Sequence, residues 1–172
     1  MRKELFNRFA AYNAWANRRL LDACARLGER EWQAARPSFF GSIHRTLNHL
    51  MVGDRLWLAR LEGESLTLSL DALLHEDLPG FRGAREALDA RIVSFVDGVD
   101  EAGLDAVCRY RASSGEPFAN RVVEILQHLF NHQTHHRGQV HGMLSATAVA
   151  PPPLDLVYFM RETPQAANSP RV

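Results

Sequence analysis

The chain has 172 residues, which suits a single domain, because a fold of this length buries roughly 70% of its extended-chain surface. Hydrophobic residues make up 46% of the sequence and charged residues 23%, which excludes a disordered chain. Basic and acidic residues number 20 each, so the net charge is zero. That balance speaks against a nucleic-acid-binding protein, which would show a basic excess.

The sequence carries no pattern of membrane insertion or secretion. No apolar run approaches the ~18 residues that a membrane span needs. The first nine residues, MRKELFNRF, are charged and amphipathic, unlike the apolar region of a signal peptide. The two cysteines, Cys24 and Cys108, are too few for a disulfide framework. We therefore expect a cytoplasmic protein without membrane or nucleic-acid partners.

Apolar residues recur at helical spacing in four long segments, and strand patterns are nearly absent. Gly28 and Gly63 are placed to end the first two segments, and Asn120 is a suitable N-cap for the fourth. The segments are 4–27, 42–62, 83–99 and 120–146.

Three other stretches interrupt or follow these helices. Segment 103–119 is irregular, and the turn residues at 113–116 indicate a short hairpin within it. Three prolines at 151–153 predict an extended stretch before a short helix over 156–160, capped by Asp155. Together these elements predict an all-α fold, an antiparallel four-helix bundle with long inter-helix links and a short C-terminal helix. We expect a single domain over 1–162 and a mobile tail over 163–172.

Histidine is the unusual residue, with eight in the chain and four of them between 128 and 136. Residues four apart on a helix lie on one face about 6 Å apart, so two imidazoles can meet at one metal ion. On a helical wheel His132 and His136 lie at or inside the apolar arc of their helix, whereas His128 and His135 lie outside it. The inward pair is therefore His132 and His136.

Two ligands are too few for a durable metal site, so a third must come from another helix. The second helix offers His44 and His49, which are five residues apart and so point to largely opposite sides. The helical wheel does not choose between them. Asn13 also lies within the apolar stripe of the first helix, where its amide needs a partner: either a neighbouring helix or a ligand histidine.

Five short strings of the sequence form a recognisable set: YNAWAN at 12–17, TLNHL at 46–50, DRLW at 54–57, NHQTHHRGQ at 131–139 and PPLDL at 152–156. With these strings the chain resembles the DinB family, a group of DinB/YfiT-like proteins regarded as metalloenzymes. The resemblance covers nearly the whole chain, and the string in the fourth helix is its most specific part. The resemblance implies a four-helix bundle with three histidine ligands, one from the second helix and an H-x-x-x-H pair from the fourth. On this sequence those residues are His49, His132 and His136.

Three neutral imidazoles would leave a coordination position for water or substrate, as in catalytic sites. Two reactions follow: hydrolysis, and transfer of a low-molecular-weight thiol, as in the related bacillithiol S-transferases and mycothiol-dependent isomerases. The alternative is a non-catalytic metal-binding helical module that dimerises or binds a partner. Imidazole ligands favour Zn or Ni, with Fe as a further candidate. The candidates for a general base near the site are Asp54, His128, His135 and Gln139.

Two further expectations concern assembly and pH. Trp15 and Trp57 lie off the main apolar stripes of their helices, which indicates a helix–helix contact between subunits and predicts a homodimer. Because protons compete with metal for neutral imidazole, metal occupancy is expected to fall below a pH of ~6.5.

Overall fold

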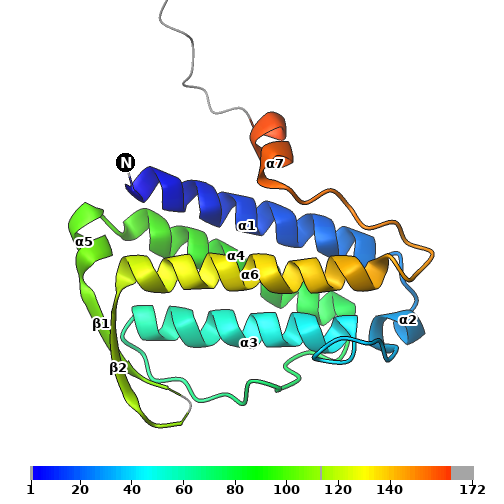
Figure 1. The fold of residues 1–172 in the computed structure, drawn as a ribbon, viewed down its shortest axis with the longest axis horizontal. Helices are drawn as coiled ribbons and strands as arrows, with labels where there is room; N and C mark the ends of the chain where they lie inside the picture. The colour runs from blue at the N-terminus through cyan, green and yellow to red at the C-terminus, as the bar shows by residue number, and fades with distance from the viewer. Residues whose placement is uncertain (1, 113, 164–172) are drawn as a thin grey trace, which may run out of the picture.

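The computed structural model describes residues 2–112 and 114–163, which contain seven helices and one two-stranded hairpin (Figure 1). The helices are α1 Arg2–Cys24, α2 Glu29–Gln33, α3 Ile43–Leu61, α4 Leu78–Gly98, α5 Glu101–Asp105, α6 Val122–Leu144 and α7 Leu156–Glu162. The strands are β1 Val107–Arg111 and β2 Pro117–Arg121. The predicted all-α class is confirmed.

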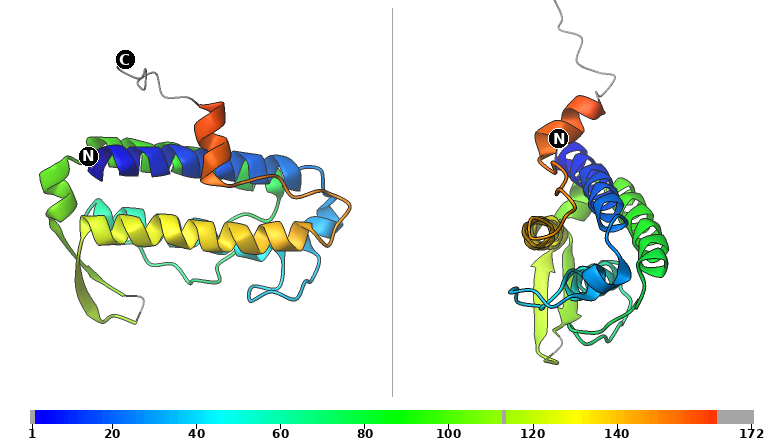
Figure 2. Two further views of the ribbon diagram at one scale, coloured as in Figure 1. Left: turned by 45° about the horizontal axis from the view of Figure 1, so that its top comes forward. Right: turned by 90° about the vertical axis from the view of Figure 1, so that its right-hand side faces the viewer.

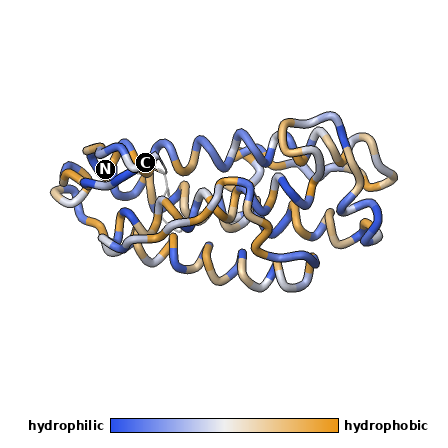
Figure 3. Tube along the Cα trace, turned by 90° about the horizontal axis from the view of Figure 1, so that it is seen from below, coloured by the Kyte–Doolittle hydropathy of each residue, from blue (hydrophilic) through white to orange (hydrophobic). Residues whose placement is uncertain are grey.

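The four long helices form a bundle in which α1 packs mainly on α4, and α3 mainly on α6. Figures 1 and 2 show these helices running side by side along the long axis. Apolar and polar residues alternate along each of them (Figure 3), because only one face of each helix enters the core. Among the described residues, no helix is both long and apolar enough to cross a membrane.

The helix boundaries differ from the predicted ones by a few residues. Helix α3 agrees closely, because the Ser42 hydroxyl accepts a hydrogen bond from the Arg45 amide at 3.1 Å and Gly63 takes a left-handed φ of 77° after the last turn. Helix α4 begins at Leu78 rather than 83, since the Asp77 carboxylate accepts from the Gly80 amide at 2.7 Å.

The predicted hairpin within 103–119 is present as β1 and β2, paired antiparallel with Tyr110 opposite Phe118. Asn120 was expected to cap the fourth helix, but it belongs to β2, and α6 starts at Val122. There the Glu124 carboxylate accepts from the Arg121 amide at 3.0 Å, which satisfies a free donor at the start of α6. The short helices α2 and α5 were not predicted.

The link over 62–77 is held against α3 by side chains of that helix. The Asn48 amide oxygen accepts from the backbone amides of Leu74 and His75 at 2.8 and 3.0 Å, and its Nδ2 donates to the His75 carbonyl at 3.1 Å. His44 Nε2 donates to the same carbonyl at 2.7 Å. His44 thus has a structural partner at the link.

Both tryptophans that prompted the dimer expectation have partners within the chain. The ring centroids of Trp15 and Phe159 of α7 are 5.8 Å apart, and the Trp15 Nε1 donates to Glu162 at 2.9 Å. Trp57 lies 5.3 Å from the Tyr110 ring of β1. Helix α7 crosses α1 in this arrangement (Figure 2). The predicted tail lies outside the described residues from 164 onward.

The homodimer stays a prediction. Helix α7 still exposes apolar side chains that a second copy would cover: Val157, Tyr158 and Met160 are 38, 38 and 42% exposed. We expect light scattering at micromolar concentration to give about twice the 19.4 kDa mass of one chain. A particle of single-chain mass would contradict the dimer.

Candidate metal centre

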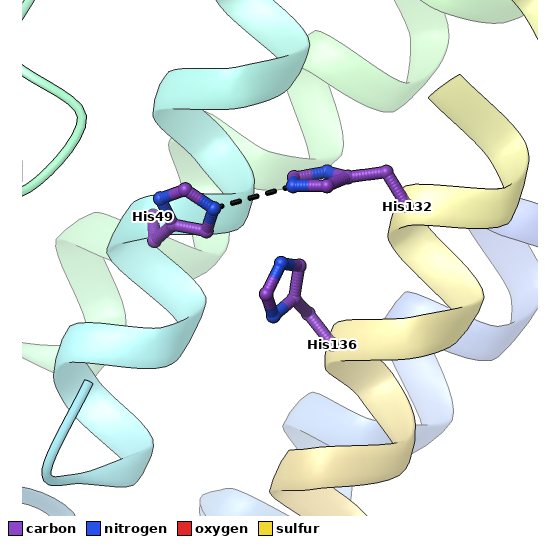
Figure 4. A group of neighbouring side chains, drawn as sticks. All are labelled: His49, His132 and His136. Atoms are coloured by element: carbon purple, nitrogen blue, oxygen red, sulfur yellow. Dashed lines mark hydrogen bonds between the residues drawn. The ribbon is translucent and has the colours of Figure 1, made fainter. Parts of the chain in front are cut away.

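Three histidines from two helices converge in the space between those helices (Figure 4). His49 comes from α3, and His132 and His136 lie one helical turn apart on α6. Each imidazole offers one nitrogen to this group, and the three nitrogens all lie within 4.8 Å of one another. The Nε2 atoms of His49 and His132 are 3.2 Å apart. The structure therefore brings together the three residues that the sequence analysis singled out, and His44 lies elsewhere.

Hydrogen bonds on the outer side of two rings fix which nitrogen faces the group. His49 Nδ1 lies 2.8 Å from the Leu70 carbonyl, which can only accept, so Nδ1 carries the proton. His136 Nδ1 lies 2.7 Å from Oε1 of Gln139 and donates in the same way. Both rings consequently present an unprotonated Nε2 to the centre of the group, as metal-ligating histidines do.

The spacing and protonation of the group fit a transition-metal ion. Two nitrogens that bind one ion tetrahedrally at about 2.0–2.1 Å lie roughly 3.3 Å apart, close to the 3.2 Å between His49 and His132. Without an ion, His132 must carry a proton on Nε2 to avoid opposing two lone pairs at that distance. Its buried Nδ1 then has no hydrogen-bond partner among the described residues. An ion would take the place of that proton.

Comparison with known proteins places this chain in a family. The family model described as "DinB family" matches residues 1–169. The chain belongs to the DinB family. It is similar to Protein DinB of Bacillus subtilis (strain 168), with 29% identity over 167 residues that cover 90% of this chain and 94% of that protein. The resemblance read from the sequence strings is thereby confirmed.

A glycine of this DinB-family chain makes room for one imidazole. A Cβ at Gly53 would lie 3.0 Å from Cε1 of His132, closer than such contacts normally occur. Gly53 is on the α3 face that packs against α6, so a side chain at this position would press on the His132 ring. The sequence alone did not predict that Gly53 faces His132, because the two residues lie on different helices.

Gly53→Ala is expected to displace the His132 ring and lower metal affinity by about tenfold or more. Isothermal titration with zinc would measure the change. The matched control is Gly142→Ala on α6, where no atom lies within 4 Å of the added Cβ. The control should bind zinc as the parent does, and equal affinity in both variants would contradict the packing role of Gly53.

Burial favours the neutral form of the two imidazoles on α6. It lowers the pKa of His132 to about 3, with further lowering by His136 and His49, and it lowers the pKa of His136 as well. Both rings are therefore in the ligand form at neutral pH. Protons compete for these two rings only below the pH of ~6.5 that was expected from free imidazole.

The same pKa shift makes the metal-free fold sensitive to acid. Between about pH 6.5 and the lower pKa of folded His132, the unfolded chain takes up a proton that the folded chain does not, so stability falls as the pH falls. In chelator, we expect the Tm to drop over this range. The drop should be smaller for His132→Gln than for the parent and for the control His135→Gln, because His135 is exposed. Equal slopes in all three proteins would contradict the shift.

Behind the histidines lies a buried polar network that joins all four long helices. Its members are Asn13 and Asn17 of α1, Asp54 of α3, Arg85 and Asp89 of α4, and Gln133 and Arg137 of α6. Each is at most 5% exposed. The two guanidinium groups balance the two carboxylates, so the network carries no net charge when all four are ionised. Gln133 and Arg137 directly follow the ligand candidates on α6, which ties the register of that helix to the network.

The network settles the role of Asn13. Its Oδ1 accepts from Arg137, and its Nδ2 donates to Asp89 at 3.2 Å. Arg137 also donates to Asn17 at 3.2 Å and to Gln133 at 3.1 Å. The Asn13 amide therefore has neighbouring helices as its hydrogen-bond partners, which is the first of the two alternatives given for it.

The four side chains considered as a general base have other partners. Burial raises the pKa of Asp54 to about 6, and the carboxylate accepts from Arg85 at 2.7 Å and from Gln133. Gln139 accepts from His136 and contacts His135 Nε2 at 3.2 Å. The His128 ring packs 4.9 Å from Trp57. Gln139 therefore orients the His136 ring, and Asp54 belongs to the buried polar network.

A groove of about 1510 Å³ lies beside the histidines, between the 62–77 link and the hairpin. Phe40 lines the groove, and its ring stacks on His49 with centroids 4.0 Å apart. Leu70 also lines it, and the Leu70 carbonyl accepts from His49. The groove therefore reaches residues that contact His49, although none of the three histidines is among its lining residues. Sequence reasoning missed Phe40, because its only signal was two adjacent phenylalanines before Gly41.

Proposed function

We propose that this chain is a metal-dependent enzyme in which His49, His132 and His136 hold a divalent transition-metal ion beside a substrate groove. Convergence of three imidazoles, one of which contacts two lining residues of that groove, supports the proposal most strongly. The nitrogen donor set favours Zn or Ni, with Fe next. When bound, such an ion lowers the pKa of water or of a thiol, which makes either one a nucleophile near neutral pH. The reaction class is hydrolysis or transfer of a low-molecular-weight thiol.

The number of protein ligands separates a catalytic site from a structural one. Structural zinc sites are closed by four protein ligands, whereas catalytic sites keep a position for water or substrate. Among the described residues, the group contains three histidines without a fourth histidine, cysteine, aspartate or glutamate. This composition supports an open coordination position.

The chain's own residues would hold the reacting groups in place. The Leu70 carbonyl and Gln139 orient the His49 and His136 rings through their Nδ1 protons. Phe40 stacks on one face of His49, and its ring centroid lies 5.5 Å from that of His136, so this ring helps to hold both imidazoles in place. The opposite side is backed by the buried network, so α6 cannot easily rotate away from α3.

Elemental analysis and activity assays together test the proposal. We expect about one transition-metal ion per chain in protein purified without chelator. The metal-loaded protein should cleave an activated ester, or transfer a small thiol to an electrophilic aromatic substrate, and chelator should abolish the reaction. Gln139→Ala would serve as a partial-loss variant, because it removes an orienting partner and no ligand. Bound metal without either reaction would favour the non-catalytic module, and a chain that binds no metal would refute both.

A further inference from the structure

The end of the groove away from the histidines holds an unusual arginine. Arg60, in the last turn of α3, lines the groove. Its guanidinium lies 4.6 Å from the ring centroid of Trp57 and 4.9 Å from that of Tyr110. Two aromatic faces therefore fix this charge in position.

Arg60 has no carboxylate partner within the described part of the chain. The two acidic residues that line the groove have other partners: Glu64 lies 3.4 Å from Arg91, and Asp71 keeps its charge but accepts a hydrogen bond from the Ser69 hydroxyl. A half-buried cation without a counter-ion is a place where an anion is stabilised.

The other charged residues of the groove lining also favour the binding of an anion. Arg109 and Arg111 of β1 also belong to its lining, which thus contains three arginines and two acidic residues. Arg111 donates to the Gly115 carbonyl at 2.7 Å, and among the described residues no carboxylate is paired with it. The groove is therefore net positive in a protein whose overall charge is zero.

Aromatic side chains line the same groove and are exposed. Phe39 is 87% exposed and Phe118 is 43% exposed. Phe118 stacks on Tyr110 with ring centroids 6.0 Å apart. Large apolar side chains left in contact with water beside a cation are typical of a binding site for a molecule with an apolar body.

The groove also has length. Arg60 follows His49 by eleven residues on α3, which corresponds to roughly 16 Å along the helix axis. Leu56 lines the groove between these two ends. One elongated molecule can therefore contact Arg60 with one end and, with the other, reach Phe40 and Leu70, the lining residues that contact His49.

We propose that the groove binds an elongated aromatic anion, whose acidic group pairs with Arg60 and whose rings pack on Tyr110 and Phe118. This inference deepens the proposed function by naming the substrate class, and it rests on that function only for what happens at the histidine end. The anion contact itself requires no metal.

Two dyes that differ by one acidic group test the inference on metal-free protein. Anilinonaphthalene sulfonate carries the anion, and phenylnaphthylamine is the same ring system without it. We expect the parent chain to bind the sulfonate more tightly, and Arg60→Gln to weaken sulfonate binding roughly tenfold while binding of the neutral dye stays the same. Fluorescence titration measures both affinities.

Two further variants complete the design. Arg55→Gln removes an exposed arginine of the same helix that is outside the groove, and it should leave sulfonate binding unchanged. Phe118→Ala removes an exposed ring with little effect on folding, and it should weaken binding of both dyes. Equal affinity of the parent for the two dyes, or an equal loss in the Arg55 and Arg60 variants, would overturn the inference. Since no metal is present, either result leaves the metal-site proposal to its own test.

Discussion

Replacing His136 with alanine is expected to remove most of the bound metal. Two imidazoles, His49 and His132, would remain, and two protein ligands do not hold a divalent ion durably. His49→Ala and His132→Ala should have the same effect for the same reason. Elemental analysis of each variant after dialysis would measure the loss, and differential scanning calorimetry would show whether the fold survives. We expect only a partial loss of stability, because none of the three histidines belongs to the main apolar core cluster.

Two other histidines provide the controls. His44 and His75 meet at the start of α4 rather than at the three-histidine group, and their replacement by alanine should leave metal content intact. His44→Ala should still cost some stability, because the His75 carbonyl loses a hydrogen-bond donor. Full metal retention in His136→Ala would refute the assignment of the site.

The largest effect on stability is expected from Arg85→Met in the buried network. Arg85 is 2% exposed and lies 2.7 Å from Asp54 and 2.9 Å from Asp89. Methionine fills a similar volume but leaves two buried carboxylates without their cation, which typically costs about 3–5 kcal/mol of unfolding free energy. Urea denaturation near neutral pH would measure it.

The pH dependence of this variant gives a second readout. Burial already raises the pKa of Asp54 to about 6 with Arg85 present, and loss of the guanidinium must raise it further. A carboxyl whose folded pKa lies above its unfolded one adds stability at low pH and loses that contribution as the pH rises. The deficit of Arg85→Met relative to the parent should therefore shrink as the pH is lowered.

Arg82→Met is the matched control on the same helix. Arg82 pairs with Asp22 at 2.9 Å, but the Asp22 side chain is 61% exposed. Exposed ion pairs contribute at most about 1 kcal/mol, so the control should unfold at nearly the urea concentration of the parent. Equal destabilisation of the two variants would mean that burial of the network is not what makes Arg85 costly to remove.

Much of this architecture follows from local periodicity. Apolar spacing identified the four long helices, because a helix that packs in a bundle must place its apolar residues on one face. The same rule selected His132 and His136 over His128 and His135, since four-residue spacing and the apolar arc are properties of α6 alone. The hairpin was also recognisable, because its turn residues are local.

The tertiary structure decided what depends on the rotation and axial register of one helix against another. His44 and His49 both satisfy the periodicity of α3, and only the packing of α3 on α6 places His49 beside His132, in the space left by Gly53. The partners of Asn13 come from two other helices, so its own stripe could not identify them. The groove needs the link, the hairpin and α3 together, and Arg60 lies within it because β1, nearly fifty residues later in the chain, folds back over α3. A sequence pattern determines which face of a helix is buried, whereas contacts between elements determine what that face meets.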